Sequence, residues 1–354
     1  MCRFKNVSIK NLTKIFTSDK KIVTAVDNVS LEIKPGEFIC LLGPSGCGKT
    51  TTLRMLAGFE MPTSGNIFVG DEDIASLTPD KRNTAMVFQN YALFPHLNVY
   101  DNISYGLKIQ KRPKEEIKSR VEKILEIMKM EDFAYRMPAQ MSGGQQQRVS
   151  LARALIMNSE ILLFDEPLSN LDAKLRIHMR DEIRKLQQEI GITSIYVTHD
   201  QAEAMALSDK IVIMKDGKII QVGSPIEIYQ NPNSAFIAKF IGRANIVKGK
   251  IIEIMENIKK VEIFGSIYNI ESEKIVEVGD QVEVVIRPES ILFNKDVHKG
   301  KVIKSIFMGE AHEYEVEMNN EVIEISLHSP RGKKVEKIND YLSFAFDSSA
   351  MHII

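Results

Sequence analysis

The stretch GPSGCGKTT, residues 43–51, decides the fold of this chain. It carries the pattern GxxxxGK[ST], in which small residues let the backbone turn tightly before a helix. The apolar run FICLLG (38–43) precedes it and is typical of a buried strand, and TTLRMLAGF (51–59) follows with apolar residues at helical spacing. A strand, a glycine-rich turn and a helix in this order begin a parallel α/β unit. The sequence therefore predicts an α/β fold with a phosphate-binding loop.

The chemistry of this loop indicates a nucleoside triphosphate. Its glycines allow backbone N–H groups to face the β- and γ-phosphates, and the helix that begins at Lys49 adds its positive end. Lys49 brings an ammonium to the phosphates, and Thr50 brings a hydroxyl to Mg²⁺. The residues expected at the nucleotide here are Gly43, Pro44, Ser45, Gly46, Cys47, Gly48, Lys49, Thr50 and Thr51.

A second acidic element is expected beside the metal. The run ILLFDEP (161–167) has four apolar residues followed by two carboxylates. A buried strand that directs Asp165 toward Thr50 would bring its carboxylate to the Mg²⁺ through water. Glu166, one residue further, would accept a proton from the attacking water or orient it.

A second anion-binding surface is predicted in MSGGQQQRVSLARAL (141–155). Ser142, Gly143 and Gly144 precede a helix that starts near Gln145, so a hydroxyl and a helix N-terminus lie together. Ser142 as the N-cap of that helix is a second reading, and it accounts for part of the pattern. Because the chain already has a phosphate loop, this second surface is expected to serve the ATP held by another subunit.

Together these three motifs resemble those of the ATP-binding cassette (ABC) ATPases. GPSGCGKTT resembles their Walker A motif, ILLFDEP their Walker B motif and SGGQQQR their signature motif. The resemblance implies that ATP and Mg²⁺ are bound, that Lys49, Glu166 and His199 are catalytic, and that Ser142, Gly143, Gly144 and Gln145 contact nucleotide.

Further stretches match the same family in order. VFQNYALFPH (87–96) resembles the Q-loop, which implies that Gln89 touches the metal and senses a membrane partner. SNLDAKLR (169–176) resembles the D-loop, with Asp172 at the subunit contact, although a helix cap is its other reading. YVTHD (196–200) resembles the switch motif, with His199 reaching the γ-phosphate. Phe16 stands where the family places an aromatic ring against adenine, and a core role is its other reading.

The chain is expected to have two domains. Residues 1–240 are predicted to form the ATPase domain, with a helical subdomain at about 90–158. Short β-type runs separated by turns dominate residues 241–354 and predict a small all-β domain. FIGRANIVKGKI (240–251) and VVIRPES (284–290) resemble the β-barrel extension of importer ATPases, of the OB-like or TOBE type.

The resemblance implies the ATP-hydrolysing subunit of an importer. Two copies would pair head to tail, bind integral membrane permease subunits, and serve a solute-binding protein indirectly. Ferric iron or a polyamine is slightly favoured as the solute, ahead of a phosphonate or a sugar. A non-transport ABC ATPase remains an alternative, as does a β-domain that chiefly binds an effector and sets the ATPase rate.

Composition limits the setting. The net charge is −1, so no bulk basic character indicates nucleic acid as a partner. The apolar runs are far shorter than the roughly 20 residues of a membrane span. Three cysteines cannot build a disulfide framework, so a reducing compartment is expected. We therefore expect a peripheral protein on the cytoplasmic face of the membrane.

Overall fold

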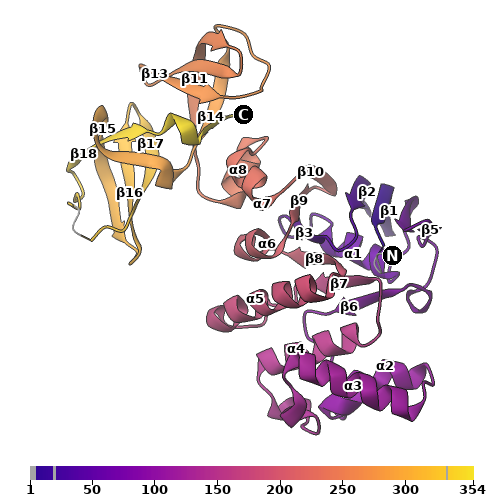
Figure 1. Ribbon diagram of the computed structural model, residues 1–354. Helices are drawn as coiled ribbons and strands as arrows, with labels where there is room; N and C mark the ends of the chain where they lie inside the picture. The colour runs from indigo at the N-terminus through magenta and orange to yellow at the C-terminus, as the bar shows by residue number, and fades with distance from the viewer. Residues whose placement is uncertain (1–4, 19–20, 332–333) are drawn as a thin grey trace. The chain divides into compact units, whose positions relative to one another are not determined.

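The computed structural model describes residues 5–18, 21–331 and 334–354, and Figure 1 shows its helices and strands. The chain divides into two compact units, Met1–Pro225 and Ile226–Ile354. The sequence predicts the boundary near residue 240. In the structure, residues 226–240 belong to the second unit.

A six-stranded sheet is the centre of the first unit. Its strand order is β10-β9-β3-β8-β7-β6. All neighbours are parallel except β10, which forms an antiparallel hairpin with β9. The strands are β3 (Phe38–Leu42), β6 (Thr84–Val87), β7 (Ile161–Asp165), β8 (Thr193–Thr198), β9 (Lys210–Lys215) and β10 (Lys218–Gly223). The strands predicted from short apolar runs are confirmed, because strands buried on both faces read as continuous apolar sequence.

Among the described residues of this unit, six α-helices accompany the sheet. They are α1 (Lys49–Ala57), α2 (Val99–Ile109), α3 (Lys114–Met128), α4 (Gly143–Leu155), α5 (Ala173–Ile190) and α6 (Gln201–Leu207). Helices α2, α3 and α4 form one group inserted between β6 and β7 (Figure 1). Pro113 is the N-cap of α3 and separates it from α2. In the described part of the chain, no helix has the length and apolar character that crossing a membrane requires.

A second, antiparallel sheet covers one side of the first unit, and the sequence analysis did not predict it. Its order is β2-β1-β4-β5, from β1 (Val7–Ser18), β2 (Lys21–Ile33), β4 (Ser64–Val69) and β5 (Glu72–Asp73). The pairing of β1 with β2 changes register three times between Ile9 and Ile15. These irregularities interrupt the two-residue alternation by which a strand is recognised. Apolar residues of β1 nevertheless share one buried core with α1 and β3.

The second unit is an all-β domain with two short helices at its start, α7 (Pro225–Gln230) and α8 (Ala235–Ile241). One sheet has the order β13-β12-β11-β14-β19 and the other β17-β16-β15-β18. The strands are β11 (Asn245–Met255), β12 (Ile258–Ile263), β13 (Ser266–Glu271), β14 (Gln281–Ile286), β15 (Ile291–Phe307), β16 (Ala311–Met318), β17 (Glu321–His328), β18 (Tyr341–Phe346) and β19 (Met351–Ile353). Side chains from both sheets share one buried core. The predicted small β-domain is confirmed, and its strands form two sheets over that core.

Candidate nucleotide site

Four predicted site segments begin where parallel strands of the central sheet end. The phosphate loop follows β3, Gln89 lies two residues beyond β6, Glu166 follows β7 and His199 follows β8. These strands are neighbours in the order β3-β8-β7-β6, and they run parallel. Their carboxyl ends therefore meet at one edge of the sheet, where ligands of open α/β folds bind.

The phosphate loop depends on glycine at two positions. Gly46 and Gly48 have φ values of +79° and +102°, which side chains rarely adopt. A Cβ on Gly48 would lie 2.3 Å from the Ala25 carbonyl oxygen, whereas a Cβ on Gly46 would have nothing within 4 Å. Gly48 is thus needed for close packing, and Gly46 borders open space. Because α1 begins at Lys49 behind a glycine N-cap, no side chain at the cap competes for its first N–H groups.

Lys49 lies folded over the loop. It is only 5% exposed, and its Nζ donates to the carbonyl oxygens of Gly43 at 2.8 Å and Pro44 at 3.0 Å. Cys47 is also buried, with its Sγ 3.7 Å from that Nζ. Hydrogen bonds from an ammonium to phosphate are stronger than those to neutral carbonyls, so phosphate can replace these two partners.

Thr50 and Asp165 are brought together from α1 and the end of β7. The Thr50 hydroxyl donates to Asp165 Oδ1 at 3.4 Å. Burial raises the pKa of the Asp165 carboxyl, while nearby Arg54 lowers it and nearby Glu166 raises it further. A divalent cation would offset the negative charge that burial makes costly here.

These oxygens fit Mg²⁺ if other ligands complete its shell. Within the described residues, no group of three or more His, Cys, Asp or Glu side chains forms a metal cage. Mg²⁺ is commonly held by one or two protein groups together with phosphate oxygens and water. The Thr50 hydroxyl and the Asp165 carboxylate provide such protein groups, and Gln89 follows the neighbouring strand at the same edge.

Glu166 and His199 form a hydrogen-bonded pair. Glu166 Oε2 lies 3.0 Å from His199 Nδ1, which donates when it carries the ring proton. Glu166 has φ +45°, and its backbone N–H donates to the Val197 carbonyl oxygen at 3.1 Å. A non-glycine residue in this conformation is strained and persists only where its surroundings fix it. The structure therefore holds this carboxylate in a defined place, against an imidazole that is largely exposed.

Glu203 is hydrogen-bonded to the strand that leads to His199, and the sequence analysis did not predict this role. Its Oε2 accepts from the Tyr196 hydroxyl at 2.8 Å and from the Thr198 hydroxyl at 2.7 Å. Burial raises the pKa of the Glu203 carboxyl, and these two hydrogen bonds lower it. Thr198 directly precedes His199, so the network fixes the end of β8. The sequence carries only a weak indication of this role, since a glutamate near a helix start is usually an exposed residue.

Two predicted residues of the neighbouring loops have structural partners. Asp172 is the N-cap of α5 and accepts from the Leu175 N–H at 3.0 Å, as its helix-cap reading expects. Gln89 is exposed, and its carbonyl oxygen accepts from Asn170 Nδ2 at 3.0 Å. Asn170 was within a quoted motif but had no predicted role. It joins the segment after β6 to the segment after β7.

The predicted signature residues start α4. Ser142 Oγ accepts from the Gln145 N–H at 3.4 Å, and Gln145 Oε1 accepts from the Ser142 N–H at 2.9 Å. This is a capping box, so the N-cap reading of Ser142 describes the isolated chain. Gly143 and Gly144 follow as the first helical residues. Figure 1 shows α4 grouped with α2 and α3, and separated from α1 and its phosphate loop by β6 and β7.

Phe16 lies on β1 with its ring accessible. Its side chain is 40% exposed, which does not fit the core reading. The Lys14 ammonium lies 4.9 Å from the ring centroid. An exposed aromatic ring offers a face on which a base can stack.

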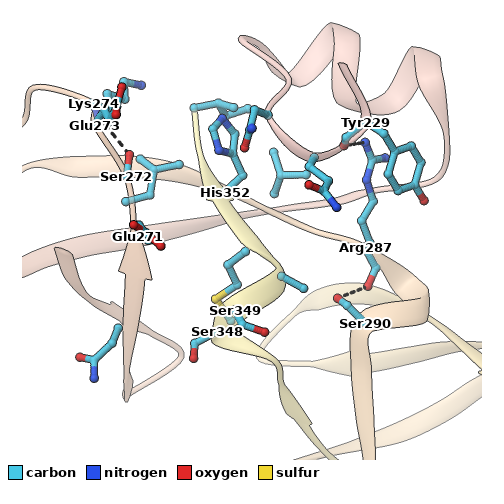
Figure 2. A pocket seen from close by; sticks show the side chains of 18 of the residues that line it. Tyr229, Glu271, Ser272, Glu273, Lys274, Arg287, Ser290, Ser348, Ser349 and His352 are labelled. Carbon is cyan, nitrogen blue, oxygen red and sulfur yellow. Dashed lines mark hydrogen bonds between the residues drawn. The ribbon is translucent and has the colours of Figure 1, made fainter. Parts of the chain in front are cut away.

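A cavity in the second unit has a volume of about 1170 Å³. Figure 2 shows Tyr229, Arg287 and His352 among its lining residues. The Arg287 guanidinium donates to the carbonyl oxygens of Ala238, Arg243 and Tyr229, and it lies 4.0 Å from the Tyr229 ring centroid. Arg287 therefore joins α7 and α8 to the sheet at one side of the cavity.

The chain is similar to known proteins over most of its length. The family described as "ABC transporter" matches residues 26–169. The chain is 45% identical over 329 residues to "Fe(3+) ions import ATP-binding protein FbpC" of Vibrio cholerae, covering 91% of each. It is 47% identical over 309 residues to "Spermidine/putrescine import ATP-binding protein PotA" of Marinobacter nauticus, covering 86% of this chain and 82% of that one.

A solved structure resembles a part of the chain. It is titled "Dimeric structure of a post-hydrolysis state of the ATP-binding cassette MJ0796 bound to ADP and Pi". The TM-score is 0.55 at 35% sequence identity, and the match covers 62% of this chain and 98% of the other. That likeness agrees with the α/β fold of the first unit.

Proposed function

This chain belongs to the ABC transporter family and is an ATPase of that family; on this premise, we propose that it energises the import of a small solute. One observation carries the proposal. The phosphate loop, Asp165 and the Glu166–His199 pair converge at one edge of the parallel sheet. That convergence provides phosphate binding, a place for a metal and a group that can activate water.

The reaction is hydrolysis of ATP by in-line attack. Glu166 accepts a proton from the attacking water or orients it, while the bond from the γ-phosphorus to the ADP oxygen breaks. Lys49 and the N–H groups of the loop hold the phosphates, and His199 approaches the γ-phosphate. When bound, Mg²⁺ supplies charge neutralisation on the phosphates, and Thr50, Asp165 and Gln89 would hold it. Phe16 would stack on the adenine.

A second copy would complete each site. The start of α4 offers a hydroxyl and a helix N-terminus, which suit an anion, yet it lies apart from the loop of its own chain (Figure 1). In a head-to-tail homodimer, Ser142, Gly143, Gly144 and Gln145 of one chain would face the ATP on the loop of the other, with Asp172 at the contact. A symmetric pair yields two such sites. ATP would then hold the two copies together, and its hydrolysis would release them.

Membrane permease subunits are the proposed partners on the aromatic segment 90–107. Phe94 and Tyr105 have ring centroids 4.4 Å apart, and Tyr105 is 39% exposed. Tyr91 in the same segment is buried. The exposed Tyr105 ring and the half-buried Phe94 ring, in the segment that follows Gln89, would receive a helix of the permease, and the segment would report its movement to the nucleotide. The chain would then be a peripheral protein on the cytoplasmic face of the membrane.

The solute is proposed to be ferric iron or a polyamine, ahead of a phosphonate or a sugar. The two relatives above carry names for Fe(3+) and for spermidine/putrescine, at similar identity. A separate solute-binding protein would deliver the solute to the permease, so this chain would contact neither the solute nor the solute-binding protein directly.

A regulatory role for the β-domain is a second candidate function. The cavity of about 1170 Å³ in the second unit supports it, because it is large enough for a small effector (Figure 2). A non-transport ABC ATPase is less well supported. Between Gln89 and Ser142 the chain has only α2 and α3 as regular helices, with no long coiled-coil pair.

An uptake panel tests the proposal. Cells that lack this protein would receive wild type, Glu166→Gln or an empty vector, and labelled ferric iron, putrescine, spermidine, a phosphonate and a maltodextrin would be offered separately. We expect wild type alone to restore uptake of one solute. Equal uptake of all five solutes in all three strains would contradict the transport role for this panel, and co-purification with a permease subunit would then test the membrane partnership by itself.

A further inference from the structure

Two consecutive residues just after Gln89 have a strained backbone. Tyr91 has φ +59° and Ala92 has φ +49°, although neither is glycine. The Ala92 N–H donates to the Asn90 carbonyl oxygen at 2.6 Å, which closes a three-residue turn around Tyr91. A γ-turn with positive φ at its centre is the rarer and more strained of the two kinds. Such a backbone persists only where other groups hold it, and it often marks a functional segment.

Two side chains of α4 hold this turn. Arg153 Nη1 donates to the Ala92 carbonyl oxygen at 2.6 Å, and Arg153 Nη2 donates to the Tyr91 carbonyl oxygen at 3.1 Å. Ser150 Oγ donates to the same Tyr91 oxygen at 2.9 Å. The rigid fork of a guanidinium suits two adjacent carbonyls, and a lysine cannot reproduce it.

Two further contacts join α4 to this segment. The Arg153 guanidinium lies 5.6 Å from the ring centroid of Phe94, two residues after the turn. The Tyr91 side chain is buried, and its hydroxyl would lie 3.5 Å from a Cβ placed on Gly143. The Tyr91 hydroxyl therefore lies near the first residue of α4, and the Tyr91 carbonyl is bound by Ser150 two turns later.

We propose that Arg153 is a positioning residue, which with Ser150 holds the strained turn at Tyr91–Ala92 and thereby sets where the chain presents Gln89. Asn170 fixes the Gln89 carbonyl from the other side, so the segment is tied both to α4 and to the loop after β7. A movement of α4 would carry Gln89 with it. The inference rests on the function proposed above, because it concerns the same nucleotide site.

A double-mutant cycle on the full-length ATPase tests the proposal. The four proteins are wild type, Arg153→Ala, Ala92→Gly and the double variant, with kcat and KM for ATP measured for each. Glycine adopts positive φ without strain, and Ala92 is exposed, so its methyl group packs little. We expect Arg153→Ala to lower kcat roughly tenfold with alanine at 92, because the unsupported turn relaxes. With glycine at 92 the same change should lower kcat less than about threefold.

The KM for ATP is the second readout. It should change little in every variant, because the phosphate loop and its lysine make no contact with Arg153 among the described hydrogen bonds. Equal losses of kcat in the two backgrounds would overturn the proposal, since a residue that merely packs α4 gains nothing from glycine at 92. A rise in the KM for ATP as large as the fall in kcat would overturn the proposal as well. Arg153→Lys should recover only part of the lost rate.

Two further variants keep the result interpretable. If Arg153→Ala does not fold, Ser150→Ala takes its place in the same cycle, because it removes only one hydrogen bond to the Tyr91 carbonyl. Glu166→Gln is run beside the cycle. If it retains turnover, the role of Glu166 in the proposed mechanism fails regardless of the cycle; if it is inactive and the cycle shows no coupling, only the role of Arg153 fails.

Discussion

Replacement of Glu166 by glutamine should remove hydrolysis and keep nucleotide binding. The amide has nearly the same shape as the carboxylate, and its oxygen can still accept from His199 Nδ1, which lies 3.0 Å away in the wild type. Backbone strain at φ +45° is the same for both residues. The substitution therefore changes the basicity of one group and little else at the edge of the sheet.

The size of the effect follows from that single loss. A positioned general base contributes roughly 10²–10⁴ in rate, which is about 3–5 kcal/mol of transition-state stabilisation. ATP affinity should stay near the wild-type value, because it depends on Lys49 and the loop, which form no hydrogen bond to Glu166 in the described part of the chain. The loss should therefore appear in kcat and not in binding.

Phosphate release and nucleotide binding are measured on the same preparations. Glu160→Gln is a matched control, because Glu160 precedes the same strand at its opposite end and pairs with Lys5 at 3.1 Å. A surface pair of this kind is worth little, so the control should hydrolyse ATP as the wild type does. Turnover of Glu166→Gln within about threefold of wild type would refute the assignment of Glu166 as the base.

The remaining predictions concern binding and stability. Lys49→Ala should weaken ATP binding roughly 10- to 100-fold in a fluorescent-nucleotide titration, since a charged hydrogen bond to phosphate is lost; unchanged affinity would contradict the loop assignment. Arg287→Ala leaves three carbonyls without their donor and should destabilise the second unit by roughly 3–5 kcal/mol in calorimetry. Arg243→Ala, which loses only partly exposed ion pairs to two glutamates, should cost less than about 1 kcal/mol, and equal effects would speak against the Arg287 contacts. The Glu203 pKa is raised above 4.5 by burial, so the folded state holds this proton more tightly than the unfolded state. Wild-type stability relative to Glu203→Gln should then fall as pH rises from about 4.5 and level off above the folded pKa, and a pH-independent difference in thermal unfolding would argue against a buried carboxyl.

The sequence predicts the parts of this site that short motifs encode. The phosphate loop, the Asp165–Glu166 pair and the start of α4 each lie within about ten residues, and strand, turn and helix signals surround them. Their convergence at one sheet edge follows from parallel strand order, which the α/β pattern implies. These features could therefore be predicted without coordinates.

Other parts depend on contacts that no local pattern encodes. The register shifts in β1 hide a strand of twelve residues from any alternation test. Glu203 and Arg153 read as ordinary charged residues of helices, and their roles appear only when β8 and the turn at Tyr91–Ala92 lie against them. Such tertiary hydrogen bonds bring together side chains and backbone groups whose pairing depends on the whole fold.

Coupling between hydrolysis and import is the most direct test of the central claim. Vesicles that contain the permease subunits would carry this chain and ATP on the inside and the identified solute with its binding protein on the outside. Solute accumulation and phosphate release would be measured together, with wild type and with Glu166→Gln. The account predicts that both occur with wild type and that both are lost with the variant. Solute accumulation that persists with Glu166→Gln, in the absence of phosphate release, would contradict it.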